Sequence, residues 1–233
     1  MTKLTFSPDV VLLDIEGTIS SQSFVIRVLY SYLRERLPAY VAAHRDDPEI
    51  QKILDDTVAL AGEGADPVET LLAWLAIDKK APPLKKVQGL VWEHGYAEGA
   101  FKGHIYDDAL AVLKRWRAAG VPLYIFSSGS LQSQIQFFQF NQAGDLRPLF
   151  SGHFDTDTGA KVDTGSYLKI AEAIGVAPER LLFFSDNPRE LVAAEAAGVQ
   201  RVQVLREDMT VDGRFPAIHS FEEVELANWP KPA

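Results

Sequence analysis

The sequence predicts an α/β fold: a parallel β-sheet covered by helices, with an all-helical insertion near its start. Short runs of β-branched and aliphatic residues alternate with amphipathic helical patterns, as is typical of a parallel sheet with helices on both faces. Three of these helical patterns stop at a glycine, a common signal for the C-terminal end of a helix. Residues 20 to about 100 interrupt the alternation, because they contain helical patterns and no strand-like run.

Four short apolar runs predict the strands of the sheet. The first is bounded by Pro8 on one side and by Glu16-Gly17 on the other, and its uniform apolar character predicts a strand buried on both faces. The predicted strands cover residues 10–13, 121–126, 180–184 and 201–205.

Helical patterns fill the segments between the strands and the whole of the insertion. The helices predicted in the sheet domain cover 107–119, 167–174 and 189–197, and those predicted in the insertion cover 24–37, 49–61, 68–77 and 84–96. We expect the first insertion helix to end at Pro38, since proline breaks a helix interior. The sequence thus predicts a core domain of residues 1–19 and 101–233 and an inserted helical domain of residues 20–100.

The composition excludes several classes of protein. The chain has 233 residues with 23 Lys and Arg against 32 Asp and Glu, a net charge of −9, so no nucleic-acid partner is expected. A small anionic substrate is still compatible with a local positive site. The lack of cysteine excludes thiol nucleophiles, thiolate metal sites and disulfides, and it fits a cytoplasmic protein. No apolar run reaches about 18 residues, so we expect neither a membrane segment nor a membrane partner.

Polar residues follow three of the predicted strands where each strand ends. They are Asp14 and Glu16 after the first strand, Ser127 and Ser128 after the second, and Asp186 and Glu190 after the third. Lys161 lies in the loop region between the second and third strands. Ligands of parallel sheets bind outside the carboxyl ends of the strands. We therefore expect these side chains to meet in one crevice.

The chemistry of that group indicates phosphoryl transfer. Crowded carboxylates require protonation or a hard cation, and oxygen ligands favour Mg²⁺. Asp14 could attack phosphorus and form an aspartyl-phosphate. Glu16 could protonate the leaving oxygen and then activate water. Ser127 and Lys161 could hold the phosphoryl oxygens as charge shifts.

Each of these residues alone also has an ordinary structural interpretation. An Asp after a strand is most often a turn or cap residue, and a single lysine is usually solvated. Asp186-Asn187-Pro188 predicts a helix start, with Asn187 or Asp186 as the N-cap and Pro188 in the first turn. The four groups in this order are much harder to explain by local structure.

The order of these groups resembles the four motifs of the haloacid dehalogenase-like phosphotransferase superfamily. The motifs correspond to DIEGT at 14–18, to Ser127, to Lys161 and to SDNPRE at 185–190. This resemblance covers almost the whole chain and implies a Rossmann-like parallel sheet core, with residues 20–100 as the helical cap that such proteins insert after the first motif. The superfamily usually has Asp-x-Asp in its first motif, where this sequence has Glu16.

The glutamate variant of the first motif resembles the enolase-phosphatase (acireductone synthase) family of methionine salvage. Further strings that look like this family are YIFSSGS at 124–130, FDTDTGAKVDTGSYLKIA at 154–171 and VWEHGYAEGAFKGHIYDD at 91–108. Two departures concern Ile19-Ser20, in place of a threonine-rich continuation, and Asp107, in place of a proline. Neither involves a proposed catalytic group.

The resemblance implies a magnesium site with one Mg²⁺ per chain. Asp14 would be both nucleophile and metal ligand, and Asp186 would be the other carboxylate ligand. Glu16 would be the acid/base and would meet the metal through its backbone carbonyl. Glu190 stands where many relatives have a second acid, so its metal contact would run through water.

The resemblance also implies the substrate and its contacts. Ser127, Ser128 and Lys161 would contact the substrate, and Lys161 would take part in catalysis. The implied substrate is 2,3-diketo-5-methylthiopentyl 1-phosphate. Enolisation would give a 2-hydroxy-3-keto phosphate, whose hydrolysis would release phosphate and the acireductone.

Two other interpretations stay open at this point. The same scaffold could serve a phosphatase of another small phosphomonoester, such as a sugar phosphate, or a non-catalytic binding protein. A dehalogenase fits less well, because that chemistry needs neither a metal nor an acid/base at Glu16. We expect a monomer, since no long heptad pattern or donor strand stands out in the sequence.

Overall fold

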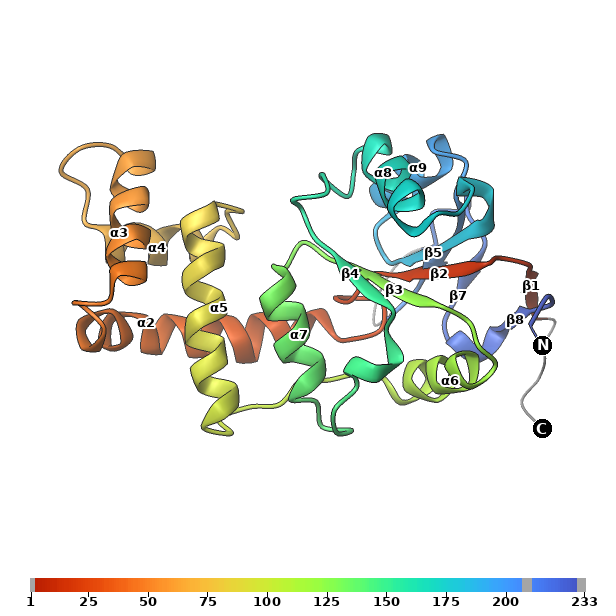
Figure 1. The fold of residues 1–233 in the computed structure, drawn as a ribbon, viewed down its shortest axis with the longest axis horizontal. Coiled ribbons are helices and arrows are strands. Elements are labelled where there is room, and N and C mark those ends of the chain that lie inside the picture. Colours follow the sequence, from red (N-terminus) through yellow and green to blue (C-terminus); the bar gives the residue numbers. More distant parts are fainter. Residues whose placement is uncertain (1–2, 207–210, 230–233) are drawn as a thin grey trace. The chain divides into compact units, whose positions relative to one another are not determined.

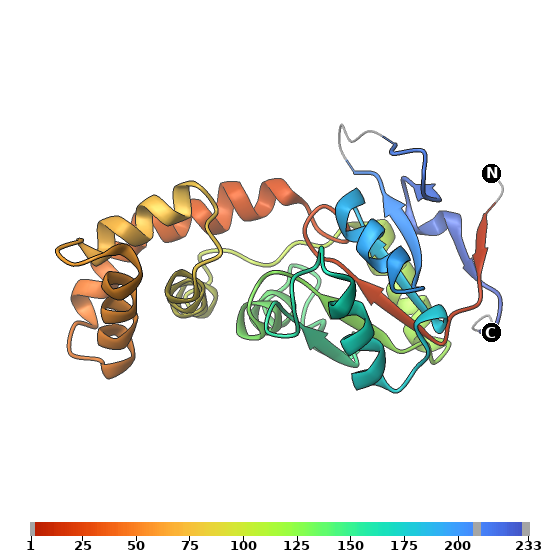
Figure 2. The same cartoon turned by 90° about the horizontal axis from the view of Figure 1, so that it is seen from above.

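The computed structural model describes residues 3–206 and 211–229. The chain divides into two compact units, one formed by residues up to Gln22 and from Gly103 onward, the other by Ser23–Lys102. The second unit runs over nearly the same residues as the insertion predicted at 20–100. Both units appear in Figure 1 and Figure 2.

The first unit is built around a six-stranded sheet in which every neighbouring pair is parallel. The spatial order is β4-β3-β2-β5-β6-β7. The strands are β2 (Val10–Leu13), β3 (Leu123–Phe126), β4 (Gly152–Phe154), β5 (Leu181–Ser185), β6 (Gln200–Val204) and β7 (Ala217–Ile218). The parallel α/β fold predicted from the sequence is confirmed.

Helices cover both faces of this sheet, which explains the uninterrupted apolar run of β2. On one face Leu12 packs in a core with Tyr167 and Leu191, which belong to the two helices drawn together above the sheet in Figure 1. On the other face Phe184 packs against Trp116, with ring centroids 5.8 Å apart. The helices are α6 (Asp107–Ala118), α7 (Leu131–Gln139), α8 (Thr164–Ile174) and α9 (Pro188–Ala196).

The strand order creates a switch point beside β2. The chain passes from β2 to β3 and outward to β4, and then returns to the opposite side of β2 to form β5. In sheets of this kind the crevice at the carboxyl ends of the strands on either side of the switch point binds ligands. The residues that follow β2 and β5 therefore occupy the position expected for a site.

Several short elements were not predicted from the sequence. Four are strands: β1 (Leu4–Phe6) and β8 (Val224–Leu226) pair in parallel as a separate two-stranded sheet, and β4 and β7 form the edges of the six-stranded sheet. The others are the helix α7 and the 3-10 turns η2 (Arg147–Leu149), η3 (Pro178–Arg180) and η4 (Phe221–Glu223). The unpredicted strands have two or three residues and are only partly buried, so their sequences lack a continuous apolar run. The glutamine residues of α7 similarly weaken its helical pattern.

The second unit contains only helices among its named elements. After α1 (Gln22–Phe24) and the π-helical turn η1 (Val25–Tyr30), they are α2 (Ser31–Ala43), α3 (Pro48–Ala61), α4 (Pro67–Ala76) and α5 (Pro82–Ala97). Their shared core includes Leu37, Ile50, Trp74 and Val87. Among the described residues of the chain, no helix combines the length and the apolar character needed to cross a bilayer.

The expected helix end at Pro38 is wrong. Helix α2 continues through Pro38 to Ala43. Proline inside a helix removes one N–H donor and its ring clashes with the carbonyl of the preceding turn, which costs about 3 kcal/mol or more. The buried side chains of Leu33, Leu37 and Val41 on the same helix provide tertiary packing on both sides of Pro38, which is what usually decides whether a helix forms.

Asp108, in the first turn of α6, joins three separate segments of the sheet unit. Its carboxylate accepts two hydrogen bonds from the Arg206 guanidinium, at 3.0 and 3.1 Å, and one from the Phe221 N–H at 2.9 Å. Burial raises the pKa of Asp108, but the hydrogen bonds from Arg206 and Phe221 outweigh it, so that the pKa is lowered overall.

Because its pKa is lowered, ionised Asp108 stabilises the fold above its ordinary pKa of 3.8, and this contribution is lost as the pH falls through the folded-state pKa. We predict that Asp108→Asn lowers the free energy of unfolding at pH 7 by about 1–3 kcal/mol. The difference from wild type should shrink below about pH 4. Urea unfolding across this range measures it, and a difference that stays constant down to pH 3 would contradict the prediction.

Candidate active site

The loop after β2 is folded tightly enough to require glycine at one position. The Ile15 carbonyl oxygen accepts hydrogen bonds from the N–H groups of residues 18–20, at 2.9–3.2 Å. Gly17 has a positive φ of 78°, and a Cβ added there would lie 2.2 Å from an oxygen of the Asp186 carboxylate. The glycine therefore allows the loop and Asp186 to approach each other closely.

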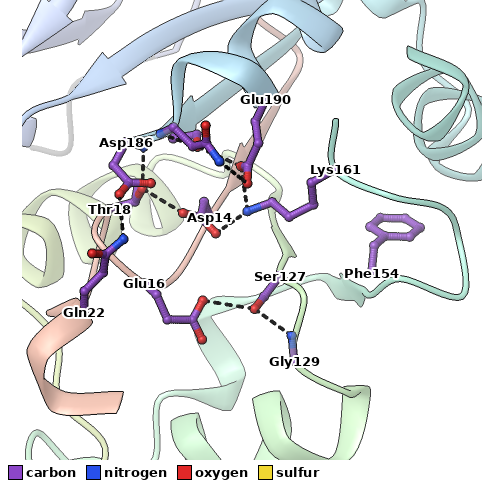
Figure 3. Close-up of polar contacts among 12 residues, drawn as sticks. Asp14, Glu16, Thr18, Gln22, Ser127, Gly129, Phe154, Lys161, Asp186 and Glu190 are labelled. Atoms are coloured by element: carbon purple, nitrogen blue, oxygen red, sulfur yellow. Dashed lines mark hydrogen bonds and ion pairs between the residues drawn. The ribbon is translucent and has the colours of Figure 1, made fainter. Parts of the chain in front are cut away.

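A single hydroxyl group connects the ends of β2 and β5. The Thr18 hydroxyl donates to Oδ2 of Asp14 at 3.0 Å and accepts a hydrogen bond from the Asp186 N–H at 3.0 Å. Figure 3 shows these three residues together, with Thr18 between the two carboxylates. The Gln22 amide donates to Oδ2 of Asp186 at 3.1 Å.

Lys161 reaches the same carboxylate from the loop after β4. Its ammonium contacts Oδ1 of Asp14 and also Oε2 of Glu190, the latter at 2.8 Å. Only 6% of the Lys161 side chain is exposed, and the Tyr167 hydroxyl donates to its backbone carbonyl at 2.7 Å. The cation is thus held in a fixed place between two buried carboxylates.

Glu190 is held by the start of α9. Its carboxylate accepts hydrogen bonds from the Ser185 hydroxyl at 2.8 Å and from the Asn187 amide at 3.2 Å. The Asn187 side chain accepts from the Arg189 N–H, with Pro188 in the first turn, so the predicted helix start is confirmed. The water-mediated metal contact expected for Glu190 stays a prediction.

Glu16 and Ser127 form a second polar group, beside the one that contains Asp14, Lys161, Asp186 and Glu190. The Ser127 hydroxyl donates to Oε2 of Glu16 at 3.2 Å and accepts from the Gly129 N–H at 3.2 Å. Figure 3 shows the Glu16 carboxylate directed toward Ser127. Among the described residues, the half-buried Ser128 forms no hydrogen bond or ion pair with either group.

Burial and crowding of like charges perturb the carboxylates. Burial raises the pKa of Asp14 well above its usual range; the Lys161 charge opposes this, while the carboxylates of Glu190, Glu16 and Asp186 add to it. Burial, followed by the Glu190 charge, raises the pKa of Asp186 to about 6. One lysine therefore leaves part of the negative charge of this group uncompensated.

Lys161 itself remains charged despite its burial. Burial lowers the pKa of Lys161, but the charges of Asp14 and Glu190 outweigh it and the pKa is raised overall. A permanently charged ammonium at Asp14 is a suitable partner for the oxygens of a phosphoryl group as well.

The donor set fits Mg²⁺ better than a transition metal. Among the described residues, no three His, Cys, Asp or Glu side chains form a complete metal cluster. Mg²⁺ does not need one, because it usually binds through one or two carboxylates together with substrate phosphate and water. Asp14 and Asp186, linked by Thr18, supply such a pair of hard oxygen ligands.

Six of the seven residues selected from the sequence make polar contacts within these two groups. The seventh, Ser128, does not. The sequence pattern indicates no role for Thr18, although Thr18 is the last residue of the string DIEGT. Gln22 carries no signal in the sequence, because its contact with Asp186 depends on two residues far apart in the chain.

Comparisons with known proteins identify the family of this chain. A family model described as haloacid dehalogenase-like hydrolase matches residues 8–198. The chain is 61% identical over 223 residues to "Enolase-phosphatase E1" of Bradyrhizobium sp. strain BTAi1, covering 96% of each chain. It is 49% identical over 221 residues to the protein of that name from Azotobacter vinelandii, covering 93% of this chain and 97% of the relative.

A solved structure extends this similarity to the fold. The crystal structure of the UTR4 protein of Saccharomyces cerevisiae is 33% identical, with a TM-score of 0.78, over 93% of this chain and 99% of the yeast chain. The family model spans the loop of the first motif, the helical insertion and the strands β2 to β5. The chain therefore belongs to the haloacid dehalogenase-like hydrolases and, among them, to the enolase-phosphatase family.

Proposed function

We propose that this chain is a Mg²⁺-dependent enolase-phosphatase of methionine salvage. It converts 2,3-diketo-5-methylthiopentyl 1-phosphate into the acireductone 1,2-dihydroxy-3-keto-5-methylthiopentene and phosphate. The observation that carries the phosphatase part is the buried Asp14 carboxylate, held by Lys161 on one oxygen and by Thr18 on the other. The name of the relatives supports the enolase part and the substrate. Cytoplasmic location and a monomeric state stay predictions.

Asp14 is the nucleophile in this proposal. One of its carboxylate oxygens forms a bond to phosphorus while the bond from phosphorus to the substrate oxygen breaks, which gives an aspartyl-phosphate. Hydrogen bonds to both oxygens fix the plane of the carboxylate before the attack. Positioning of this kind, with charge stabilisation from Lys161, provides most of the catalysis in phosphoryl transfer.

Glu16 is the acid/base. It gives its proton to the leaving oxygen, and the resulting carboxylate then takes a proton from the water that attacks the aspartyl-phosphate, which restores Asp14 and releases phosphate. Ser127, already hydrogen-bonded to Glu16, and Ser128 contact the phosphorylated substrate. Lys161 keeps the developing charge on the phosphoryl oxygens close to a cation.

Asp14 and Asp186 would hold Mg²⁺, together with the backbone carbonyl of Glu16. When bound, the ion neutralises carboxylate and phosphoryl oxygens and polarises the substrate carbonyl for enolisation. The raised pKa values of the two aspartates support this assignment, because a nucleophile has to be ionised and a nearby cation favours the ionised form.

Purified protein supplied with the diketo phosphate and Mg²⁺ should produce both the enol and phosphate. Ultraviolet absorbance follows the enol and a phosphate assay follows hydrolysis, in the same tube. We expect stoichiometric phosphate, with both signals lost on adding a chelator. Phosphate release from simple phosphomonoesters without turnover of the diketone would reject the proposed substrate.

Asp14→Asn should reduce phosphate release by at least about 10³-fold, because the variant lacks the nucleophile. Asp145→Asn is the matched control, because this carboxylate is exposed and its ion pair is with the neighbouring Arg147. The control should retain wild-type rates. Substantial phosphate release by Asp14→Asn would reject Asp14 as the nucleophile.

Glu16→Asp should slow both enol formation and phosphate release by roughly 10-fold or more, since general acid–base catalysis contributes about 10²–10⁴-fold. The shorter side chain withdraws the carboxyl by about 1.5 Å, one C–C bond, from its position 3.2 Å from the Ser127 hydroxyl. Rates are measured with the diketo phosphate. Unchanged rates for both steps would refute a role for the extra methylene.

Asp186→Asn should remove most of the thermal stabilisation that Mg²⁺ gives to the protein without substrate. A ligand at 100 times its dissociation constant stabilises a fold by about 2.7 kcal/mol. Differential scanning fluorimetry during a Mg²⁺ titration measures the effect, with Asp145→Asn as the control that keeps the wild-type shift. An equal shift in Asp186→Asn would place the ion elsewhere.

A further inference from the structure

Arg206 lies two residues beyond the end of β6 and contacts three separate segments of the sheet unit. Its guanidinium donates to both oxygens of Asp108, at 3.0 and 3.1 Å. Its Nε donates to the backbone carbonyl of Thr18 at 3.1 Å, and Nη1 donates to that of His219 at 3.2 Å. Every edge of the planar guanidinium group is therefore used.

The surroundings of Arg206 hold it in one orientation. Its side chain is 10% exposed and that of Asp108 is 21% exposed. The guanidinium lies over the Tyr106 ring, 4.3 Å from the centroid. A guanidinium group that makes two hydrogen bonds to one carboxylate and also stacks on an aromatic ring has little freedom to move.

Thr18 is the residue through which this cluster reaches the candidate active site. Its backbone carbonyl accepts from Arg206, while its hydroxyl donates to Asp14 and accepts from the Asp186 N–H. The backbone carbonyl of Thr18 thus belongs to the Arg206 cluster, and its side-chain hydroxyl belongs to the candidate active site. A shift of the carbonyl moves the hydroxyl with it, because both belong to the same tightly folded loop.

We propose that Arg206 is a positioning residue of the reaction. By holding the Thr18 carbonyl it fixes the Thr18 hydroxyl and, through that hydroxyl, the orientation of the Asp14 carboxylate. The inference rests on the proposed role of Asp14 as the nucleophile. Arg206 itself touches none of the reacting atoms in this proposal.

Lysine cannot reproduce this arrangement. An ammonium at position 206 would keep an ion pair with Asp108, but it lacks the planar fork that serves Asp108 and Thr18 simultaneously. Arg206→Lys therefore separates the two possible roles. If Arg206 only stabilised the fold through Asp108, the lysine variant would keep its activity; if it positions Thr18, the variant would lose activity while remaining folded.

The experiment is a double-mutant cycle between Arg206→Lys and Thr18→Val. The valine substitution removes the hydroxyl of residue 18 but keeps its backbone carbonyl. Phosphate release from p-nitrophenyl phosphate and from the diketo phosphate gives kcat and KM, and thermal unfolding gives Tm. We expect each single variant to lose roughly 10-fold or more in kcat with little change in KM, since small misplacements of catalytic groups cost up to about 10²-fold. The double variant should be no slower than the worse single variant.

Arg180→Lys is the matched control. Arg180 forms a hydrogen-bonded pair with Asp9, with Nε 3.0 Å from Oδ2, at the amino ends of β5 and β2 and hence at the opposite edge of the sheet. Its substitution should leave kcat unchanged, and its effect should simply add to that of Thr18→Val.

Three results would overturn the inference: wild-type kcat in Arg206→Lys, an equal loss in Arg180→Lys, or losses that multiply in the double variant. If Arg206→Lys did not fold, two other variants would test the same point. Arg206→Gln keeps an amide donor for the Thr18 carbonyl, so its kcat should be higher than that of Arg206→Met. Equal kcat values for the two variants would count against the inference.

Failure of the proposed substrate is distinguishable, because the cycle can be measured with p-nitrophenyl phosphate alone. Failure of Asp14 as the nucleophile appears separately in Asp14→Asn.

Discussion

The buried contact between the Asp14 carboxylate and the Lys161 ammonium is the interaction on which the rest of the site depends. Two charges removed from water are stable only when each is paired and hydrogen-bonded, and breaking such a pair leaves an uncompensated charge. Lys161 meets this requirement by contacting Asp14 and Glu190. Asp186 also lies beside Asp14, so that the charge of Lys161 acts on three carboxylates. This imbalance makes the crevice suited to a further cation.

The parallel sheet makes this concentration of charge possible. Asp14 and Asp186 directly follow the adjacent strands β2 and β5, whose residues pair in register from Val10 with Leu181 to Leu13 with Phe184. Neighbouring parallel strands end side by side, so two acids that are far apart in the sequence become neighbours without any bend in either strand. The remaining geometry comes from Gly17, whose missing side chain leaves room for Asp186.

The sequence predicts the parts of this site that depend on local pattern and not those that depend on distant contacts. The run before Asp14 predicts β2 because both faces of that strand are buried and every residue is apolar. The helix start at Asn187 is equally local, since the cap bond spans two residues. By contrast, the partners of Arg206 lie at positions 18, 108 and 219. Nothing in the pattern around Arg206 distinguishes it from a surface arginine, and its contacts form only when three separate segments of the chain meet.

Asp14 and Glu16 follow the same strand and are separated by one residue, but their carboxylates have different partners. The proposed reaction needs this difference, because it gives the two carboxylates different roles. Asp14 is held by a cation and a hydroxyl donor, and the Lys161 charge opposes the rise in the Asp14 pKa that burial causes. Glu16 turns away to the neutral hydroxyl of Ser127 and stays outside the Lys161 pair. The extra methylene of Glu16 gives the side chain the length to reach Ser127 across the crevice. The nucleophile and the acid/base of the proposed reaction thus have separate partners within a single loop.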